Sequence, residues 1–249
     1  MPSAVRTTRF EFSGVSGLSA SFKTVGVLGG MGPDATIDFL SEVVSLTKAG
    51  CDQDHIPMLV DNNTKVPNRQ AAILGDGDDP GPIIGRMGRR LEAAGADFLV
   101  MPCNSAHAFL EPLAELTTIP LISIIEVTAD ACKDYSSVGI LATDGCLEFG
   151  GFQQALRDRG VTPVVPEAPD VAELMRLITC IKAGDKGPEV QRSVRDLAAT
   201  LIERGAEAII AGCTEIPLVL SEGELPVPVI NSTRALARAT IAAAGAEIR

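Results

Sequence analysis

Apolar residues occur along this chain in short runs, separated by segments with helical spacing. The runs VGVLGGMGP (25–33), PMLVDNN (57–63) and DFLVMPC (97–103) predict buried strands, and the first ends in a glycine-rich turn. Helix-like stretches lie between them, at about 34–48 and 83–94. Strands that alternate with helices are typical of an α/β fold with a mainly parallel sheet.

The later part of the chain repeats the earlier part. LEAAGADFLVMPCN (91–104) aligns without a gap on LIERGAEAIIAGCT (201–214), so that Cys103 coincides with Cys213. The shorter segments VGVLGG and VGILAT also correspond. The repeat predicts two similar, pseudo-symmetric α/β lobes, each with a mainly parallel sheet flanked by helices.

The repeat also divides the chain. Residues 24–122 together with 231–249 form the expected first lobe, and residues 123–230 form the expected second lobe. Residues 1–23 show neither a helical nor a strand period, and we expect them to be an N-terminal extension. The chain has no linker rich in Pro or Ser between the two lobes.

Composition and charge narrow the class of protein. The chain has 249 residues, of which 46% are hydrophobic and 21% charged, which is typical of a globular protein. Its 21 Lys and Arg against 32 Asp and Glu give a net charge of −11, which disfavours nucleic acid and anionic membranes as partners. The apolar runs have the length of strands, so the sequence predicts a soluble protein with no membrane span.

The cysteines indicate the redox state of the cellular compartment, and two of them are candidate reactive groups. The six cysteines have no CxxC pair and no secretory segment before them, which predicts reduced thiols in the cytoplasm and no metal site. Cys103 and Cys213 each follow a predicted strand, and ligands of parallel sheets bind at the carboxyl ends of the strands. Two facing lobes would therefore bring these two thiols to one cleft.

The segments MPCNSAH and AGCTEIP place each of these cysteines before a polar residue that can cap a helix. A helix N-terminus lowers the pKa of a thiol and favours the thiolate. A single cysteine after a strand can simply be a small buried apolar residue, but two cysteines at equivalent positions argue against that interpretation. A base on one face of a carbon and an acid on the other can invert its configuration, and two thiols can supply both.

Through these motifs the sequence resembles the cofactor-independent aspartate/glutamate racemase family, on its aspartate-racemase branch. The resemblance runs from Thr24 to Ala244 through GGMGP (29–33), NNTKVPNRQAAIL (62–74), MPCNSAH, VGILAT, IKAG (181–184) and GCTEIP. It implies a substrate bound between two similar α/β lobes, and neither pyridoxal phosphate nor a metal. It also implies catalysis by a cysteine thiolate and a cysteine thiol.

The resemblance makes Cys103 and Cys213 the acid/base pair and surrounds the substrate with Met31, Arg69, Asn104, Ser105, Thr143, Lys182 and Thr214. Asn104, Ser105 and Thr214, with nearby backbone amides, would hold the α-carboxylate of the substrate. Arg69 and Lys182 would meet a side-chain carboxylate.

Four residues allow more than one interpretation. His107 could tune the pKa of a catalytic thiol or be structural, and Glu215 could cap its own helix or hold the ammonium group of a substrate. Cys146 stands where the family often has Thr, so it could line the pocket, and we expect a polar contact there rather than a third catalytic thiol. Asn231 stands where an acidic residue is common. The preferred substrate therefore stays open.

The sequence thus predicts a racemase that interconverts the enantiomers of aspartate or glutamate. A racemase of broader or different amino-acid specificity, or an isomerase of the maleate or hydantoin type, remains an alternative. A non-catalytic protein that closes two lobes on a dicarboxylate would explain the repeat, but not the two equivalent thiols. Homodimers are common in the resembling family, so the resemblance allows one here.

Overall fold

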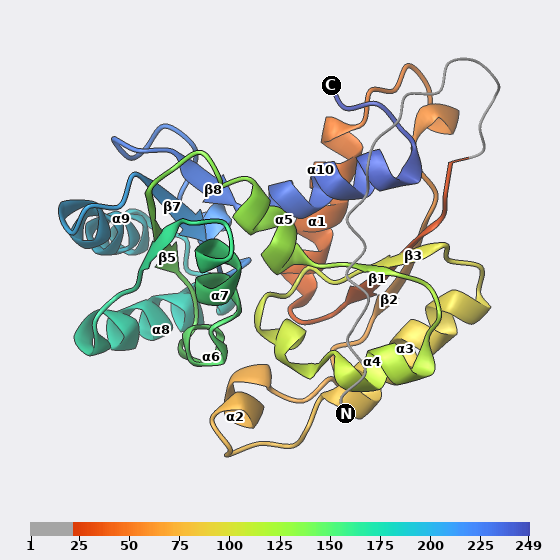
Figure 1. Ribbon diagram of the computed structural model, residues 1–249, viewed down its shortest axis with the longest axis horizontal. Coiled ribbons are helices and arrows are strands. Elements are labelled where there is room, and N and C mark those ends of the chain that lie inside the picture. Colours follow the sequence, from red (N-terminus) through yellow and green to blue (C-terminus); the bar gives the residue numbers. More distant parts are fainter. Residues whose placement is uncertain (1–21) are drawn as a thin grey trace.

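The computed structural model describes residues 22–249, which form two lobes (Figure 1). Each lobe contains a four-stranded sheet, ordered β2-β1-β3-β4 in the first lobe and β6-β5-β7-β8 in the second. All strand pairs within the two sheets are parallel. The predicted α/β fold with two similar lobes is confirmed, while the predicted extension over residues 1–23 lies almost wholly outside the described residues.

The apolar runs form the central strands, because strands buried on both faces need side chains that pack on both sides. The strands of the first lobe are β1 (Val25–Gly29), β2 (Met58–Asn62), β3 (Phe98–Val100) and β4 (Leu121–Ile122). Those of the second lobe are β5 (Ser137–Leu141), β6 (Thr162–Val164), β7 (Ala208–Ala211) and β8 (Val229–Asn231). The third apolar run is longer than its strand, and its last three residues, 101–103, form a loop.

The helices cover the two faces of each sheet. Those assigned to the first lobe are α1 (Pro33–Leu46), α2 (Arg69–Ile73), α3 (Gly81–Ala93), α4 (Glu111–Leu116) and α10 (Ser232–Ala244). Those that follow β4 and the later strands are α5 (Ile124–Asp130), α6 (Asp144–Phe149), α7 (Gly151–Arg157), α8 (Ala168–Lys182) and α9 (Pro188–Glu203). Short 3-10 helices are η1 (Asp52–Asp54), η2 (Ser105–Phe109) and η3 (Ile216–Leu218). No helix between residues 22 and 249 has the length and apolarity needed to cross a membrane.

The sequence repeat is visible in individual hydrogen bonds. Asp97 accepts a bond from the backbone N–H of Thr24 at 2.7 Å, and Glu207, at the equivalent position, accepts one from Ser136 at 2.7 Å. Each acidic residue follows a helix and precedes a strand. Its hydrogen bond fixes the start of β3 beside β1 in the first lobe, and the start of β7 beside β5 in the second. The repeat therefore preserves a local folding unit as well as a sequence pattern.

A continuous apolar core joins the two lobes. One cluster of buried side chains contains Val27 and Phe98 from the first sheet, Ile124 from α5, and Ile140 and Ile210 from the second sheet. Helix α10 contacts both α1 and α5, and so it packs beside the same junction (Figure 1). The lobes need no linker sequence because they are held by buried apolar surface.

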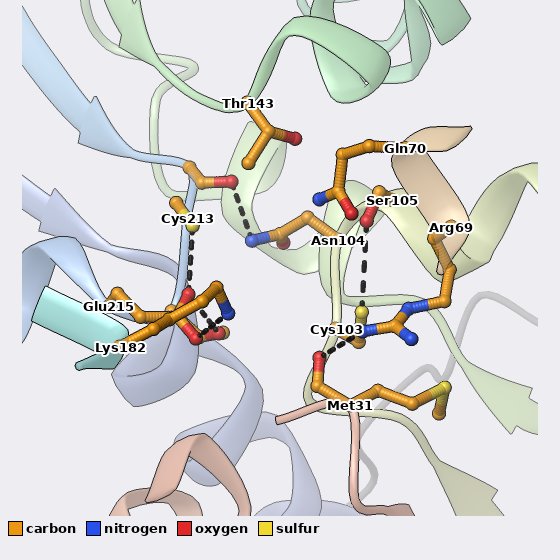
Figure 2. Close-up of a pocket in the computed structure, with 12 residues that line it drawn as sticks. Met31, Arg69, Gln70, Cys103, Asn104, Ser105, Thr143, Lys182, Cys213 and Glu215 are labelled. Atoms are coloured by element: carbon orange, nitrogen blue, oxygen red, sulfur yellow. Dashed lines mark hydrogen bonds and ion pairs between the residues drawn. The ribbon is translucent and has the colours of Figure 1, made fainter. Parts of the chain in front are cut away.

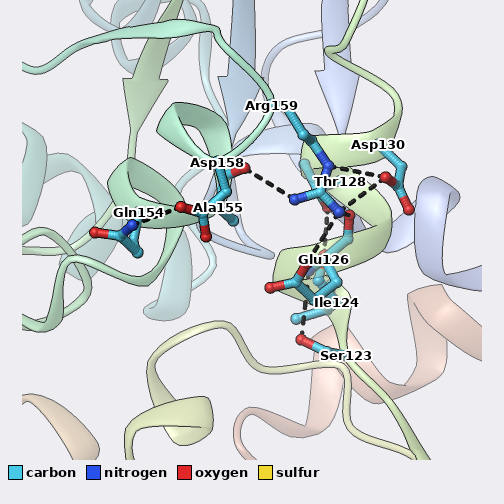
Figure 3. A network of polar contacts seen from close by, with 9 residues as sticks. All are labelled: Ser123, Ile124, Glu126, Thr128, Asp130, Gln154, Ala155, Asp158 and Arg159. Carbon is cyan, nitrogen blue, oxygen red and sulfur yellow. Dashed lines mark hydrogen bonds and ion pairs between the residues drawn. The ribbon is translucent and has the colours of Figure 1, made fainter. Parts of the chain in front are cut away.

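A polar network ties α5 to the end of α7 (Figure 3). Arg159 donates through Nη2 to Oε2 of Glu126 at 2.9 Å and through Nε to Oδ1 of Asp130 at 2.8 Å. Its Nη1 donates to the carbonyl oxygen of Ala155 at 2.9 Å. Burial by itself would lower the pKa of Arg159, but its hydrogen bonds to the two carboxylates raise the pKa overall. The network fixes α5, the helix that connects the first sheet to the second.

Gly30 makes the turn after β1 possible. Its φ is +89°, and a Cβ at this position would lie 2.6 Å from the backbone nitrogen of Asn63 and closer still to its carbonyl group. We expect Gly30→Ala to lower the free energy of unfolding by about 3 kcal/mol or more, because backbone strain and a backbone clash add together. Chemical denaturation measures this loss.

Gly75 offers the matched control. Its φ is +87°, but no atom lies within 4 Å of the position that a Cβ would take. Gly75→Ala should therefore show only the strain of the left-handed backbone, about 1–2 kcal/mol. Equal losses in the two variants would contradict the steric argument for Gly30.

Candidate active site

The loops after the central strands of both sheets surround one small cavity (Figure 2). Its lining residues are Met31, Arg69, Gln70, Cys103, Asn104, Ser105, Thr143, Lys182, Gly212, Cys213, Thr214 and Glu215. All nine predicted site residues line this cavity, although they come from seven separate elements and loops of the two lobes. Figure 2 shows Cys213, Glu215 and Lys182 on one side of it and Cys103, Ser105 and Arg69 on the other.

Cys103 lies in the loop between β3 and η2. Its buried Sγ is 3.8 Å from the hydroxyl oxygen of Ser105. The Nδ1 atom of His107 lies 2.9 Å from the carbonyl oxygen of Cys103, and Nε2 accepts a bond from the N–H of Ile124 at 3.3 Å.

These contacts define the role of His107. Burial lowers the pKa of His107 to about 4, so the ring is neutral near pH 7. With Nε2 as the acceptor, Nδ1 carries the proton and donates to the Cys103 carbonyl. His107 thus fixes the backbone at Cys103 and makes its hydrogen bond to the carbonyl group rather than to the thiol.

The expected helix caps after the two cysteines are absent. The elements that follow are the 3-10 helices η2 and η3, and the N-cap residues, Asn104 and Glu215, make no capping hydrogen bond with their side chains. Short 3-10 segments align few peptide dipoles, so they create only a weak field. The capping prediction, which concerned Asn104 and Thr214, was therefore wrong. Asn104 donates instead to Gly212 in the other lobe, and Thr214 is not an N-cap residue.

Cys213 lies opposite, in the loop between β7 and η3. Its buried Sγ donates a hydrogen bond to Oε2 of Glu215 at 2.9 Å, and the hydroxyl group of Thr214 lies 3.4 Å from the same oxygen. Burial and the negative charge of Glu215 raise the pKa of Cys213 well above its usual value. Cys213 is therefore a protonated thiol in this structure.

The other oxygen of Glu215 forms an ion pair with Nζ of Lys182, the last residue of α8. The Glu215 side chain is 6% exposed and that of Lys182 is 45% exposed. Burial by itself would lower the pKa of Lys182, but the charge of Glu215 raises it overall, so Lys182 stays protonated. Glu215 therefore links Cys213 to a cation that reaches solvent.

Arg69 is the first residue of α2, and backbone carbonyls hold its guanidinium group. Nη1 donates to Pro67 at 2.8 Å and to Val66 at 3.3 Å, and Nη2 donates to Met31 at 3.1 Å. Nε is buried and has no hydrogen-bond partner among residues 22–249. The group is fixed in place and keeps donor capacity for an anion.

Asn104 projects between the two thiols. Its Nδ2 donates to the carbonyl oxygen of Gly212 at 2.8 Å, whereas its buried Oδ1 has no partner in the described part of the chain. The group that could bind a carboxylate is thus already engaged, and the free oxygen can accept a bond from an ammonium group. This geometry differs from the α-carboxylate contact that the resemblance implies.

Thr143 and Cys146 share one turn. Thr143 is the N-cap of α6, and its hydroxyl oxygen accepts a bond from the N–H of Cys146 at 3.3 Å. Cys146 is buried and is not one of the residues that line the cavity, and burial raises its pKa to about 12. Of these two residues only Thr143 can meet a ligand in the cavity.

Gln70 and Gly212 also line the cavity, and the sequence did not identify them. Gln70 follows Arg69 on α2, which packs on α6, so that a Cβ on Gly145 would lie 3.0 Å from the Cα atom of Gln70. Gly212 contributes a carbonyl group, which carries no side-chain signal. Within residues 22–249, no three His, Cys, Asp or Glu side chains are grouped so that they could hold a metal ion.

The cavity, its paired thiols and the repeated parallel sheets agree with a known family. The sequence profile described as Asp/Glu/hydantoin racemase matches residues 28–240 of this chain. The chain belongs to the Asp/Glu/hydantoin racemase family. It is therefore a member of a family of isomerases that includes amino-acid racemases.

Two further comparisons support this membership of the racemase family. A broad-specificity amino-acid racemase of Bacillus subtilis is 27% identical over 225 residues, which are 87% of this chain and 96% of that protein. An aspartate racemase of Picrophilus torridus has a similar structure, with a TM-score of 0.82 and 29% identity over 91% of this chain and 96% of that one.

A more distant racemase shares the fold. Glutamate racemase of Francisella tularensis, in complex with D-glutamate, has a TM-score of 0.65 at 15% identity, over 90% of this chain and 81% of that one. At this identity the similarity shows the two-lobe fold alone.

Proposed function

We propose that this protein is an amino-acid racemase that interconverts L- and D-aspartate or L- and D-glutamate, without pyridoxal phosphate, by two-base proton transfer at Cα. One observation carries the proposal: Cys103 and Cys213, at equivalent positions of the sequence repeat, line the same cavity from the two lobes. A carbon held between two thiols can lose a proton to one of them and gain a proton from the other.

The contacts of the two thiols suggest the state in which the cycle begins. Cys213 donates a hydrogen bond to Glu215, so we assign Cys213 as the proton donor and Cys103 as the base. Cys103 removes the Cα proton of one enantiomer, and Cys213 delivers its proton to the opposite face. After this transfer Cys103 is a thiol and Cys213 is a thiolate. This form of the protein accepts the other enantiomer.

The polar groups of the cavity can hold the three charged groups of the substrate. Oδ1 of Asn104 would accept a hydrogen bond from the α-ammonium group, which supplies the partner that this buried oxygen lacks. The hydroxyl groups of Ser105 and Thr214, with the adjacent backbone amides, would hold the α-carboxylate. Arg69 and Lys182 would bind the side-chain carboxylate of an acidic amino acid.

A racemase of broader specificity is the second candidate, and the ion pair of Lys182 with Glu215 favours it. Because Glu215 offsets the charge of Lys182, Arg69 is the only cationic residue of the lining that forms no ion pair within residues 22–249. A cavity with one such cation prefers acidic side chains less strongly than a cavity with two. The similarity to a broad-specificity racemase points the same way.

NMR in deuterated water tests both candidates. Purified protein is incubated separately with L-aspartate, L-glutamate, L-alanine and L-leucine, and both the Cα proton signal and the enantiomer ratio are followed. Exchange and formation of the D-enantiomer with the two acidic amino acids alone support the first candidate. The same result with alanine and leucine supports the second.

The same sample distinguishes the remaining alternatives. Turnover of maleate or of a substituted hydantoin, with no amino-acid exchange, would replace the racemase proposal with another isomerase. Calorimetric binding of a dicarboxylate without turnover would support a binding protein. No reaction with any of the amino acids contradicts the proposal.

Three further proposals concern the whole chain. We propose the lobe boundaries 24–122 with 231–249 and 123–230, which the contacts of α10 with α1 support. A reducing, cytoplasmic location fits the free state of all the cysteines. The proposal of a homodimer rests on the family resemblance, and light scattering tests it by measuring the molar mass in solution.

A further inference from the structure

A hydrogen-bonded cluster joins the two lobes one residue away from each candidate catalytic cysteine. Asn104 follows Cys103, and Gly212 precedes Cys213. The bond from Nδ2 of Asn104 to the carbonyl oxygen of Gly212 therefore connects the two cysteine loops directly, across 108 positions of sequence. Figure 2 shows the amide nitrogen of Asn104 turned toward this carbonyl group.

Ser232 is the third residue of the cluster. Its hydroxyl oxygen lies 3.4 Å from Nδ2 of Asn104, and it donates to the carbonyl oxygen of Ala211 at 2.9 Å. Ser232 is fully buried and is not one of the residues that line the cavity. It therefore contacts the Cys103 loop and the last residue of β7, which leads into the Cys213 loop, without lining the cavity.

The position of Ser232 is itself well determined. It is the first residue of α10, whose N-cap residue Asn231 accepts a hydrogen bond from the N–H of Arg234 at 3.0 Å. Asn231 also pairs with Ala211 in the ladder between β7 and β8. An aspartate oxygen could accept the same bond, so the cap is compatible with either an amide or an acid at position 231. Because α10 also packs on α1, the hydrogen bond of Ser232 connects the helices of the first lobe to the end of β7.

The cluster also sets the orientation of the Asn104 amide. Rotation of the amide by half a turn would place Oδ1 against the carbonyl oxygen of Gly212, and two acceptors repel each other. With Nδ2 fixed, Oδ1 keeps its lone pairs for the cavity. The same contacts thus place the two cysteine loops and the free acceptor between them.

We infer that Ser232 is a positioning residue that, with Asn104, forms a clasp between the lobes and sets the separation of the two thiols. The inference rests on the proposed function, because two-base transfer requires both thiols to reach one carbon atom from opposite sides. Ser232 acts through Asn104 and the Ala211 carbonyl, and its hydroxyl group touches neither the substrate nor the thiols.

Ser232→Ala tests the clasp, and Thr233→Val is the matched control. Thr233 is the next residue of α10, is equally buried, and has a hydroxyl group without a partner among residues 22–249. We expect Ser232→Ala to lower kcat about 10-fold to 100-fold at nearly unchanged KM, since a misplacement of about 1 Å can cost 100-fold. Thr233→Val should keep the activity of the unmodified protein. Ser232→Thr, which retains a hydroxyl group, should have most of the activity that Ser232→Ala loses.

A second readout does not depend on turnover. The short bifunctional thiol reagent dibromobimane is added to each variant, and peptide mass spectrometry quantifies the bridge between Cys103 and Cys213. A lower bridge yield in Ser232→Ala than in Thr233→Val supports the clasp even if the protein racemises no amino acid tested. Equal bridge yields in the two variants overturn the inference, and so does equal kcat where racemisation is measurable.

Discussion

Cys103→Ala and Cys213→Ala should each lower kcat for racemisation by about 1,000-fold or more. A positioned acid or base contributes about 100-fold to 10,000-fold, and each variant lacks one member of the pair. The expected loss does not come from unfolding, because each Ala removes only a sulfur atom at the wall of the cavity. Circular dichroism verifies the fold, and a chiral assay of the product measures the rate.

Cys51→Ser is the matched control, because Cys51 is exposed and lies outside the cavity. It should retain full activity. The two Ala variants also show which enantiomer each remaining thiol deprotonates, when each enantiomer is incubated separately in deuterated water. The variant that keeps Cys103 should exchange the Cα proton of one enantiomer only, and the variant that keeps Cys213 that of the other. Full racemisation in either variant would refute the two-base mechanism.

Glu215→Gln should move the high-pH limb of the kcat/KM profile to lower pH. The high-pH limb reports loss of the thiol form that donates the proton, and Cys213 is that thiol in the proposed cycle. Burial and Glu215 raise the pKa of Cys213, so removal of the carboxylate charge lowers this pKa. The charged and polar groups that face Glu215 are Cys213, Lys182 and Thr214, and the positive charge of Lys182 lowers the pKa of Cys213 further once Glu215 is neutral.

The sign of the effect follows from these charges. In the unmodified protein Cys213 stays protonated to higher pH, and activity persists there. In Glu215→Gln the thiol ionises at lower pH, so activity falls at a pH where the unmodified protein is still active. Glu203→Gln, a change of the same charge at an exposed position of α9, should leave the profile unchanged.

Alkylation measures the same change without an assay of activity. Iodoacetamide reacts with the thiolate, and peptide mass spectrometry follows each cysteine separately as the pH is raised. In Glu215→Gln, Cys213 should react at lower pH than in the unmodified protein, with exposed Cys51 as the internal reference. An unchanged pH dependence of Cys213 alkylation would contradict the role assigned to Glu215.

The region around α10 shows how far local reasoning extends. The sequence placed residues 231–249 with the first lobe, which stays a prediction, and in the structure α10 contacts both α1 and α5. The family resemblance made Asn231 a departure from an expected acid, whereas the structure shows it as an N-cap. Ser232 carried no signal, because a serine in the first turn of a helix is common and its tertiary partners lie far away in sequence.

The sequence by itself determined the fold class, the duplication and the two cysteines at the ends of equivalent strands. These features follow from local patterns, since apolar runs make strands and a gapless repeat makes the same unit twice. Only the tertiary structure decided which polar groups meet. Asn104 was expected to cap its own helix, yet it donates to Gly212 in the other lobe. The protonation of Cys213 likewise depends on burial and on the charge of Glu215, which the positive charge of Lys182, 33 positions from Glu215, opposes. The pKa of a thiol responds to the charges around it in space.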